Sequence, residues 1–288
     1  HCIGDGMALL QVLLSLADEY FDPDRFPATE HRTGLLPGAV RGALQAVQGT
    51  VSTGQRLLSE GARTLLGPSH ALHRAKQGMS VGAALSKFVS LGPDADTPLK
   101  GELGVAQRAT WSGPLSLARI KRLGRVIDAK VNDVLLGAVA GALRHYVASR
   151  DALDRADTVR ALVPVNLRPP EQAFELGNRF GLVFLDLPIG LENRLERVLA
   201  VKAQMDEIKN SAEAVAAFGV LESLGYVPLS VEAQAVRYFT NKASAVMTNV
   251  PGPQESLHMK GRPLKTVMPW VPRAGHVGLG VSIFSYDG

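Results

Sequence analysis

Residues 130–147 read KVNDVLLGAVAGALRHYV and indicate a buried helix. Asn132 and Asp133 stand at its start, and the residues that follow are almost all apolar, as in a helix packed inside a domain. Further along, VRALVPVNL (159–167) and RFGLVFLDLPI (179–189) have the apolar character of buried strands. Helices and strands that intermix in this way predict an α/β sandwich of a mixed sheet and packed helices.

The rest of the chain contributes elements of the same kinds. An amphipathic pattern begins after Gly6 and predicts a helix that ends before Phe21. The alternation in VAQRATW (105–111) predicts a strand, and Pro114 predicts the start of a helix. Toward the C-terminus the pattern predicts a helix over 195–209, mostly helical chain over 211–240, and strands at 244–248 and 276–286.

Composition divides the chain into three parts. Residues 1–21 end a first packed unit, residues 22–100 form a long and partly helical crossover, and residues 101–288 form a second unit. The stretch 38–66 within the crossover places arginines among leucines and valines. Such a stretch packs as an ordinary surface helix or rests on a membrane or lipid-droplet surface, and we favour the surface helix.

Length, charge and cysteine content exclude several classes of protein. The 288 residues are 46% hydrophobic and 20% charged, which fits a globular protein with a large core. The net charge of +4 is small and dispersed, so it does not indicate a nucleic-acid partner. No segment has the roughly 20 apolar residues that cross a bilayer. The single cysteine, Cys2, allows no intrachain disulfide and fits a reducing, cytoplasmic setting.

The chain opens with HCIGDG (1–6), in which His1 and Asp5 are one helical turn apart. An imidazole held in this way could work as a general base, and Gly6 leaves room for a ligand or a sharp turn. The alternative is that Asp5 caps the following helix and His1 ends a strand. A metal site is disfavoured because no further His or Cys pair has ligand spacing.

Other polar residues have a structural interpretation beside the functional one. Asn132 and Asp133 are interpreted as an N-cap with an acidic first turn, or as residues that contact a substrate. Nucleophile-elbow, phosphate-loop and dinucleotide-binding patterns are absent from the sequence. The other histidines are interpreted as structural or surface residues: His70, His73, His145, His258 and His276.

Together these motifs resemble the bacterial wax ester synthase/diacylglycerol acyltransferase family. HCIGDG resembles the second half of that family's His-His-x-x-x-Asp-Gly motif, and KVNDVLLGAVAGALR resembles its Asn-Asp helix. ALVPVNLRP, GNRFG, TNVPGP and the closing SYDG follow in the family's order. The resemblance covers essentially the whole chain, and six ordered motifs are more specific than any one of them.

The resemblance implies a fold and a reaction. The expected fold is chloramphenicol acetyltransferase-like, with two α/β subdomains around a tunnel and with most of the N-terminal subdomain missing here. The expected reaction moves a fatty acyl group from acyl-CoA to diacylglycerol or a long-chain alcohol. His1 is the implied general base, Asp5 orients its loop, and Gly6, Asn132 and Asp133 line the substrate site. No metal or other cofactor is implied.

Two alternatives remain open at this point. One is an acyltransferase of the same superfamily that uses another acceptor or a carrier-protein thioester. The other is a non-catalytic module that binds lipid or a membrane surface. Because half of a two-subdomain core is missing, we also expect this piece to fold poorly alone.

Overall fold

The computed structural model describes residues 6–18, 86–168, 178–224, 226–271 and 275–288. A four-stranded sheet lies at its centre, with the strand order β2-β1-β3-β6. β1 pairs antiparallel with β2 and parallel with β3, and β3 pairs parallel with β6. This confirms the predicted mixed sheet. The strands are β1 (Val159–Asn166), β2 (Phe180–Leu187), β3 (Ala245–Pro251) and β6 (Leu279–Ser285).

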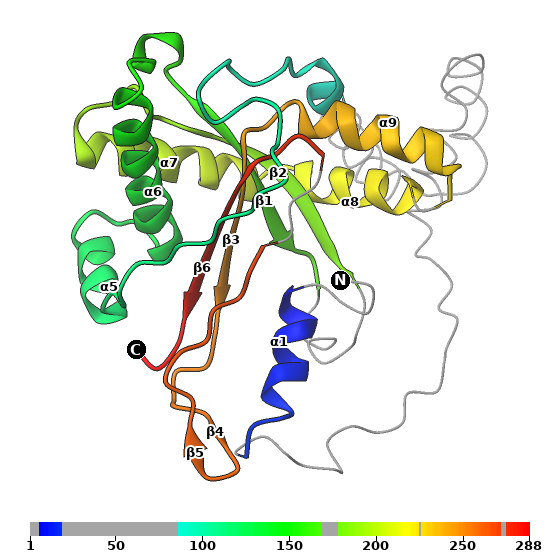
Figure 1. Ribbon diagram of the computed structural model, residues 1–288. Coiled ribbons are helices and arrows are strands. Elements are labelled where there is room, and N and C mark those ends of the chain that lie inside the picture. The colour runs from blue at the N-terminus through cyan, green and yellow to red at the C-terminus, as the bar shows by residue number, and fades with distance from the viewer. Residues whose placement is uncertain (1–5, 19–85, 169–177, 225, 272–274) are drawn as a thin grey trace, which may run out of the picture.

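Helices cover both sides of this sheet. Figure 1 shows α6 and α7 on one side and α8 and α9 on the other, while α1 lies below α8 in this view, near a short hairpin of β4 and β5. The predicted α/β sandwich is therefore confirmed. The helices are α1 (Gly6–Leu14), α5 (Leu117–Val126), α6 (Val131–Ala148), α7 (Arg194–Lys209), α8 (Glu213–Leu224) and α9 (Leu229–Thr240), with a 3-10 turn η3 (Leu153–Arg155) and the short strands β4 (His258–Met259) and β5 (Arg262–Pro263).

The main core fills the space between the sheet and the helices α6 and α7. Odd-numbered residues of β1, β2 and β3 point into it, because side chains alternate between the two faces of a strand. Val159, Leu185 and Ala245 are fully buried there. From the helices, Leu136 and Val201 complete the cluster. The even-numbered residues of the same strands are left to face the opposite side.

Small residues let α6 and α7 approach closely. A Cβ on Gly137 would lie 2.6 Å from Cγ2 of Val198, and one on Gly141 would lie 3.0 Å from Nη2 of Arg197. Arg197 is buried, and it donates from Nη1 to the carbonyl of Leu191 at 2.7 Å. Burial lowers the pKa of this guanidinium from its ordinary value. The two glycines therefore make room for a buried cation between the helices.

Residues 86–100, the last part of the predicted crossover, are bound to the sheet by two buried charged side chains. Asp94 Oδ2 accepts hydrogen bonds from the Arg160 amide at 3.0 Å and from the Ser244 hydroxyl at 2.5 Å. Lys242 donates from Nζ to the carbonyl of Phe88 at 2.9 Å. These contacts join the chain before residue 100 to β1 and to the start of β3. The rest of the predicted crossover, up to residue 85, lies outside the described residues.

Several predicted boundaries are wrong. Residues 105–111 form no strand, because they pair with no strand in the described part of the chain. Their side chains are exposed. The helix after Gly6 ends at Leu14, where amides begin to bond three residues back. The strand predicted at 244–248 continues to Pro251, because it pairs with β6 along that length. The last strand is shorter than predicted and begins at Leu279.

A substitution at Gly181 would measure how tightly α8 packs against the sheet. A Cβ there would overlap backbone atoms of Ala214 at the start of α8, so we expect Gly181→Ala to lower the free energy of unfolding by about 1–3 kcal/mol. Gly219, within α8, is the matched control, because a Cβ there meets nothing within 4 Å. Gly219→Ala should raise stability by up to about 1 kcal/mol through helix propensity. Thermal unfolding of both variants of the complete protein measures the difference, and equal shifts would contradict this packing.

Candidate active site

An apolar cavity of about 850 Å³ lies on the side of the sheet opposite the main core. Its floor consists mainly of even-numbered strand residues, among them Leu162, Phe184 and Val246, and Asn249 and Pro251 at the end of β3 also line it. Helix α8 adds Val220 and Leu221, and α1 and α9 complete the wall. A cavity of this size, lined almost entirely by hydrocarbon, suits a long alkyl chain.

Polar side chains gather along part of this cavity. Asn249 Nδ2 donates to Oδ1 of Asn132 at 3.1 Å. This bond joins β3 to the first turn of α6, two elements 117 residues apart in the chain. Of these two asparagines, Asn249 lines the cavity, and the further polar residues that line it are Asn166, Asn178, Thr240, Thr248 and Ser282. A hydrocarbon pocket with amide and hydroxyl groups can hold a long chain and position an ester or thioester.

Asp133 has a structural role that the sequence interpretation describes only in part. The N-cap of α6 is Lys130, not Asn132, and Asp133 is the third residue of the helix. Its Oδ2 accepts from the Lys130 amide at 2.9 Å, which satisfies a donor that the helix leaves open. Asn132, one residue earlier, points in a different direction around the helix and bonds with Asn249 instead.

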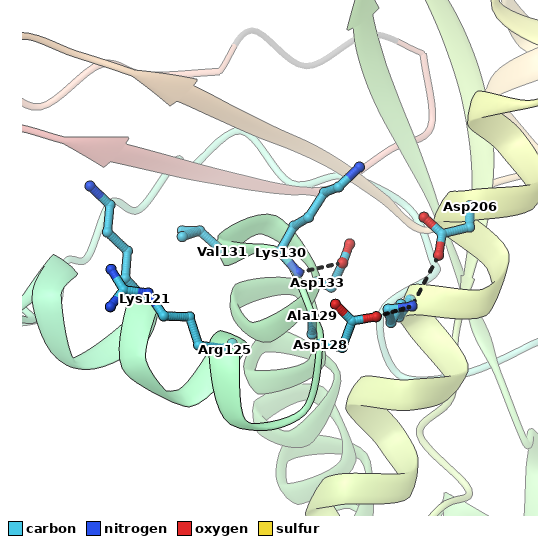
Figure 2. Close-up of a pocket in the computed structure, with 10 residues that line it drawn as sticks. Lys121, Arg125, Asp128, Ala129, Lys130, Val131, Asp133 and Asp206 are labelled. Carbon is cyan, nitrogen blue, oxygen red and sulfur yellow. Dashed lines mark hydrogen bonds and ion pairs between the residues drawn. The ribbon is translucent and has the colours of Figure 1, made fainter.

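A second, polar pocket of about 610 Å³ lies at the N-terminal end of α6 and is lined mostly by charged residues. Figure 2 shows it between α5, the start of α6 and α7. Lys202 on α7 lies 3.3 Å from Asp206 and 3.8 Å from Asp128. The hydrogen bond to Asp206 raises the pKa of the Lys202 ammonium above its ordinary value. Lys209 also lies 3.8 Å from Asp206, so two lysines offset the charge of the two aspartates on the α7 side of the pocket.

The remaining residues of the predicted site divide between described and undescribed chain. His1 and Asp5 lie outside the described residues, so their roles stay predictions. Gly6 is the first residue of α1. The same helix contributes Leu9, Leu10 and Leu13 to the apolar cavity. The helix that follows the HCIGDG motif is thus part of the cavity wall, whereas Asp133 lines the polar pocket and not the cavity.

Two motifs far apart in the sequence lie against each other. The Gly252 amide of TNVPGP donates to the Ser285 carbonyl at 3.1 Å, and the Asp287 amide of SYDG donates to the Pro253 carbonyl at 3.1 Å. A Cβ on Gly252 would overlap the ring of Phe284. Glycine is therefore required where the end of β3 meets the end of β6.

The polar residues that the sequence interpretation missed as site residues come from strands and strand ends. Asn249 lies near the end of β3, and Asn178 lies just before β2. Both line the cavity. The sequence did contain a signal for Asn249, because asparagine is uncommon within β-strands. Which face each asparagine takes depends on the register of the sheet.

None of the helices in the described ranges combines the length and the apolar character needed to cross a bilayer.

The chain is similar in sequence to a known domain family and to known proteins. Residues 176–288 match the family model described as the WS/DGAT C-terminal domain. The Mycobacterium tuberculosis (strain H37Rv) protein named "Probable diacyglycerol O-acyltransferase tgs1" is 28% identical over 296 residues, which cover 99% of this chain and 59% of that protein. The chain therefore spans about three fifths of the length of this relative.

Solved structures share the fold. The wax ester synthase/diacylglycerol acyltransferase from Marinobacter aquaeolei VT8 has a TM-score of 0.51 at 22% identity, covering 78% of this chain and 49% of that chain. The epimerization domain from the third module of tyrocidine synthetase B has a TM-score of 0.52 at 11% identity, and the match covers 98% of this chain and 59% of that domain's chain. These likenesses confirm the predicted fold class.

Proposed function

Since residues 176–288 match the model of the WS/DGAT C-terminal domain, we propose that the complete protein is an O-acyltransferase that uses acyl-CoA. Its acceptor is the hydroxyl of a diacylglycerol or a long-chain alcohol, and its product is a triacylglycerol or a wax ester. The observation that carries this proposal is the apolar cavity with polar side chains at the Asn249–Asn132 bond. Such a cavity suits a fatty chain whose reactive carbonyl must be held among amide groups.

The proposed chemistry needs a base and no covalent intermediate. A neutral His1 accepts the proton of the acceptor hydroxyl while the oxygen attacks the thioester carbonyl. The tetrahedral intermediate then collapses, the carbon–sulfur bond breaks, and the imidazolium returns the proton to the departing thiolate. Asp5 orients the loop that carries His1. The reaction balances with one ester and one free thiol as products, and it uses no metal or other cofactor.

Asn132 and Asn249 are proposed to position the reacting carbonyl as a pair. If they act as one unit, Asn132→Ala and Asn249→Ala should each lower kcat/KM, and the double variant should lose less than the sum of the single losses. We expect a coupling energy of about 0.5–3 kcal/mol, as found for side chains in direct contact. A double-mutant cycle on acyl transfer measures it, and strictly additive losses would argue against a shared role.

The cellular setting follows from the substrates in this proposal. Fatty acceptors partition into lipid, so the protein is proposed to be cytoplasmic and to meet membranes or lipid droplets from their surface. Nucleic acid is not a proposed partner.

Acceptor-dependent thiol release tests the function itself. The complete protein is given palmitoyl-CoA with hexadecanol, with dipalmitoylglycerol, or with no acceptor. Release that requires an acceptor, with the matching ester found by mass spectrometry, supports the proposal and identifies the preferred acceptor. No ester from either acceptor, with intact binding of lipid, would favour a non-catalytic lipid-binding module. Transfer only from a carrier-bound thioester would favour another acyltransferase of the same fold.

A further inference from the structure

The polar pocket at the N-terminal end of α6 has cations without acidic partners. Lys121 and Arg125 lie on α5, and Lys130 caps α6. None of the three forms an ion pair within the described ranges, whereas Asp128 and Asp206 both pair with Lys202. Figure 2 shows Lys121 and Arg125 along α5, on the side away from Asp128 and Asp206. The α5 side of the pocket is therefore positive and open to an anion.

The start of α6 strengthens this positive side. The N-terminal end of the 18-residue helix α6 lies at the pocket, because Lys130, Val131 and Asp133 line it, and the N-terminal end of a helix favours negative charge. The turn before the helix is rigid, because the Ala129 amide donates to the Gly124 carbonyl at 2.8 Å and Asp128 has a φ of 50°. The start of α6 is therefore held in position before a phosphate binds.

A buried and unsatisfied acceptor gives an independent indication of a ligand. Asp133 is fully buried and lines the pocket. One carboxylate oxygen, Oδ2, accepts from the Lys130 amide, but Oδ1 has no hydrogen-bond partner among the described residues. Leaving such an oxygen unpaired is costly. It calls for a ligand with N–H or O–H donors in addition to its negative charge.

Neighbouring residues at the start of α6 connect the pocket with the apolar cavity. Asp133 lines the pocket, and its neighbour Asn132 holds Asn249, which lines the cavity. A molecule with a phosphorylated head, amide or hydroxyl donors in the middle and a long alkyl chain matches this order of groups. A thioester between head and chain would then lie near the Asn132–Asn249 bond.

We infer that the pocket formed by Lys121, Arg125, Lys130 and Asp133 binds the phosphorylated head of the acyl-CoA donor. Lys121 and Arg125 bind the phosphates, and Asp133 Oδ1 accepts from an N–H or O–H group of the head. This inference rests on the proposed function and adds to it the residues that recognise the donor. The two acidic residues on the α7 side have cationic partners of their own, because Asp128 pairs with Lys202, and Asp206 pairs with both Lys202 and Lys209.

The test compares two double variants that remove the same charge from the same helix. Lys121→Gln/Arg125→Gln removes the two cations that line the pocket, whereas Arg119→Gln/Arg122→Gln removes two exposed cations of α5 that do not line it. We expect the first variant to raise KM for palmitoyl-CoA about ten- to hundredfold with little change in kcat. The second should change KM less than about threefold.

A second donor separates this inference from the proposed function. Palmitoyl-pantetheine has the same thioester and chain but no phosphate, so both double variants should use it as well as the unmodified protein does. Equal KM values for palmitoyl-CoA in the two double variants, with normal transfer from palmitoyl-pantetheine, would overturn the phosphate site and leave the transferase intact. No transfer from either donor by the unmodified protein would overturn the proposed function itself.

Discussion

Replacing His1 by alanine in the complete protein should lower acceptor-dependent thiol release about a hundred- to ten-thousandfold. An alcohol is too weak an acid to attack a thioester unaided at neutral pH, and general-base assistance is worth about that factor. The loss should appear in kcat rather than in KM for palmitoyl-CoA, because the proton transfer occurs only as the bond forms. Stopped assays of free thiol with saturating donor and acceptor measure it.

His145 provides the matched control for this variant. It lies on the exposed side of α6 near the C-terminal end of that helix, away from the residues that line the cavity. His145→Ala should retain full activity and the same thermal unfolding midpoint as His1→Ala. If the two variants were equally active, His1 would have no part in the chemistry, and the base would have to be sought elsewhere.

Filling the apolar cavity should change which acyl chains are used. Val220 on α8 lines the cavity, so Val220→Trp places an indole where a chain would lie. Burial of a methylene group is worth about 0.8 kcal/mol. An indole that displaced about three methylenes would therefore lower kcat/KM for palmitoyl-CoA about fiftyfold. Butyryl-CoA, whose chain is too short to reach the indole, should keep its rate.

Val215 gives the control on the same helix. Its side chain is 55% exposed and does not line the cavity, so Val215→Trp should leave the chain-length profile unchanged. Competition assays with mixed acyl-CoA donors give the profile for all three proteins. A uniform fall for short and long donors in Val220→Trp would mean that the cavity does not hold the acyl chain.

Much of the fold follows from local patterns. The apolar run after Asn132 predicts α6, and the two apolar strands that follow it are found within one or two residues of their expected bounds. The helix predicted at 195–209 is α7. The prediction for 105–111 is wrong because alternation within a strand has meaning only when a neighbouring strand is present. That segment has no such neighbour in the described part of the sheet.

The candidate site could be predicted from the sequence only in part. Asn132 and Asp133 are adjacent, and the sequence interpretation treated them as one motif. In the structure they separate, with Asn132 bonded to Asn249 beside the cavity and Asp133 closing the first turn of α6 in the polar pocket. Adjacent residues on a helix diverge by about 100°, so a pair that is continuous in sequence can serve two different sites.

By itself, the sequence determined that the chain is an α/β protein, where its strongest helices and strands lie, and which motifs it carries, because hydrophobic period and turn residues are local properties. Only the tertiary structure decided that even-numbered residues of the strands line a cavity and that Asn249 meets Asn132 across 117 residues. The reason is physical. Strand order and register are set by the packing of the whole sheet against its helices, and no short stretch of sequence contains that information.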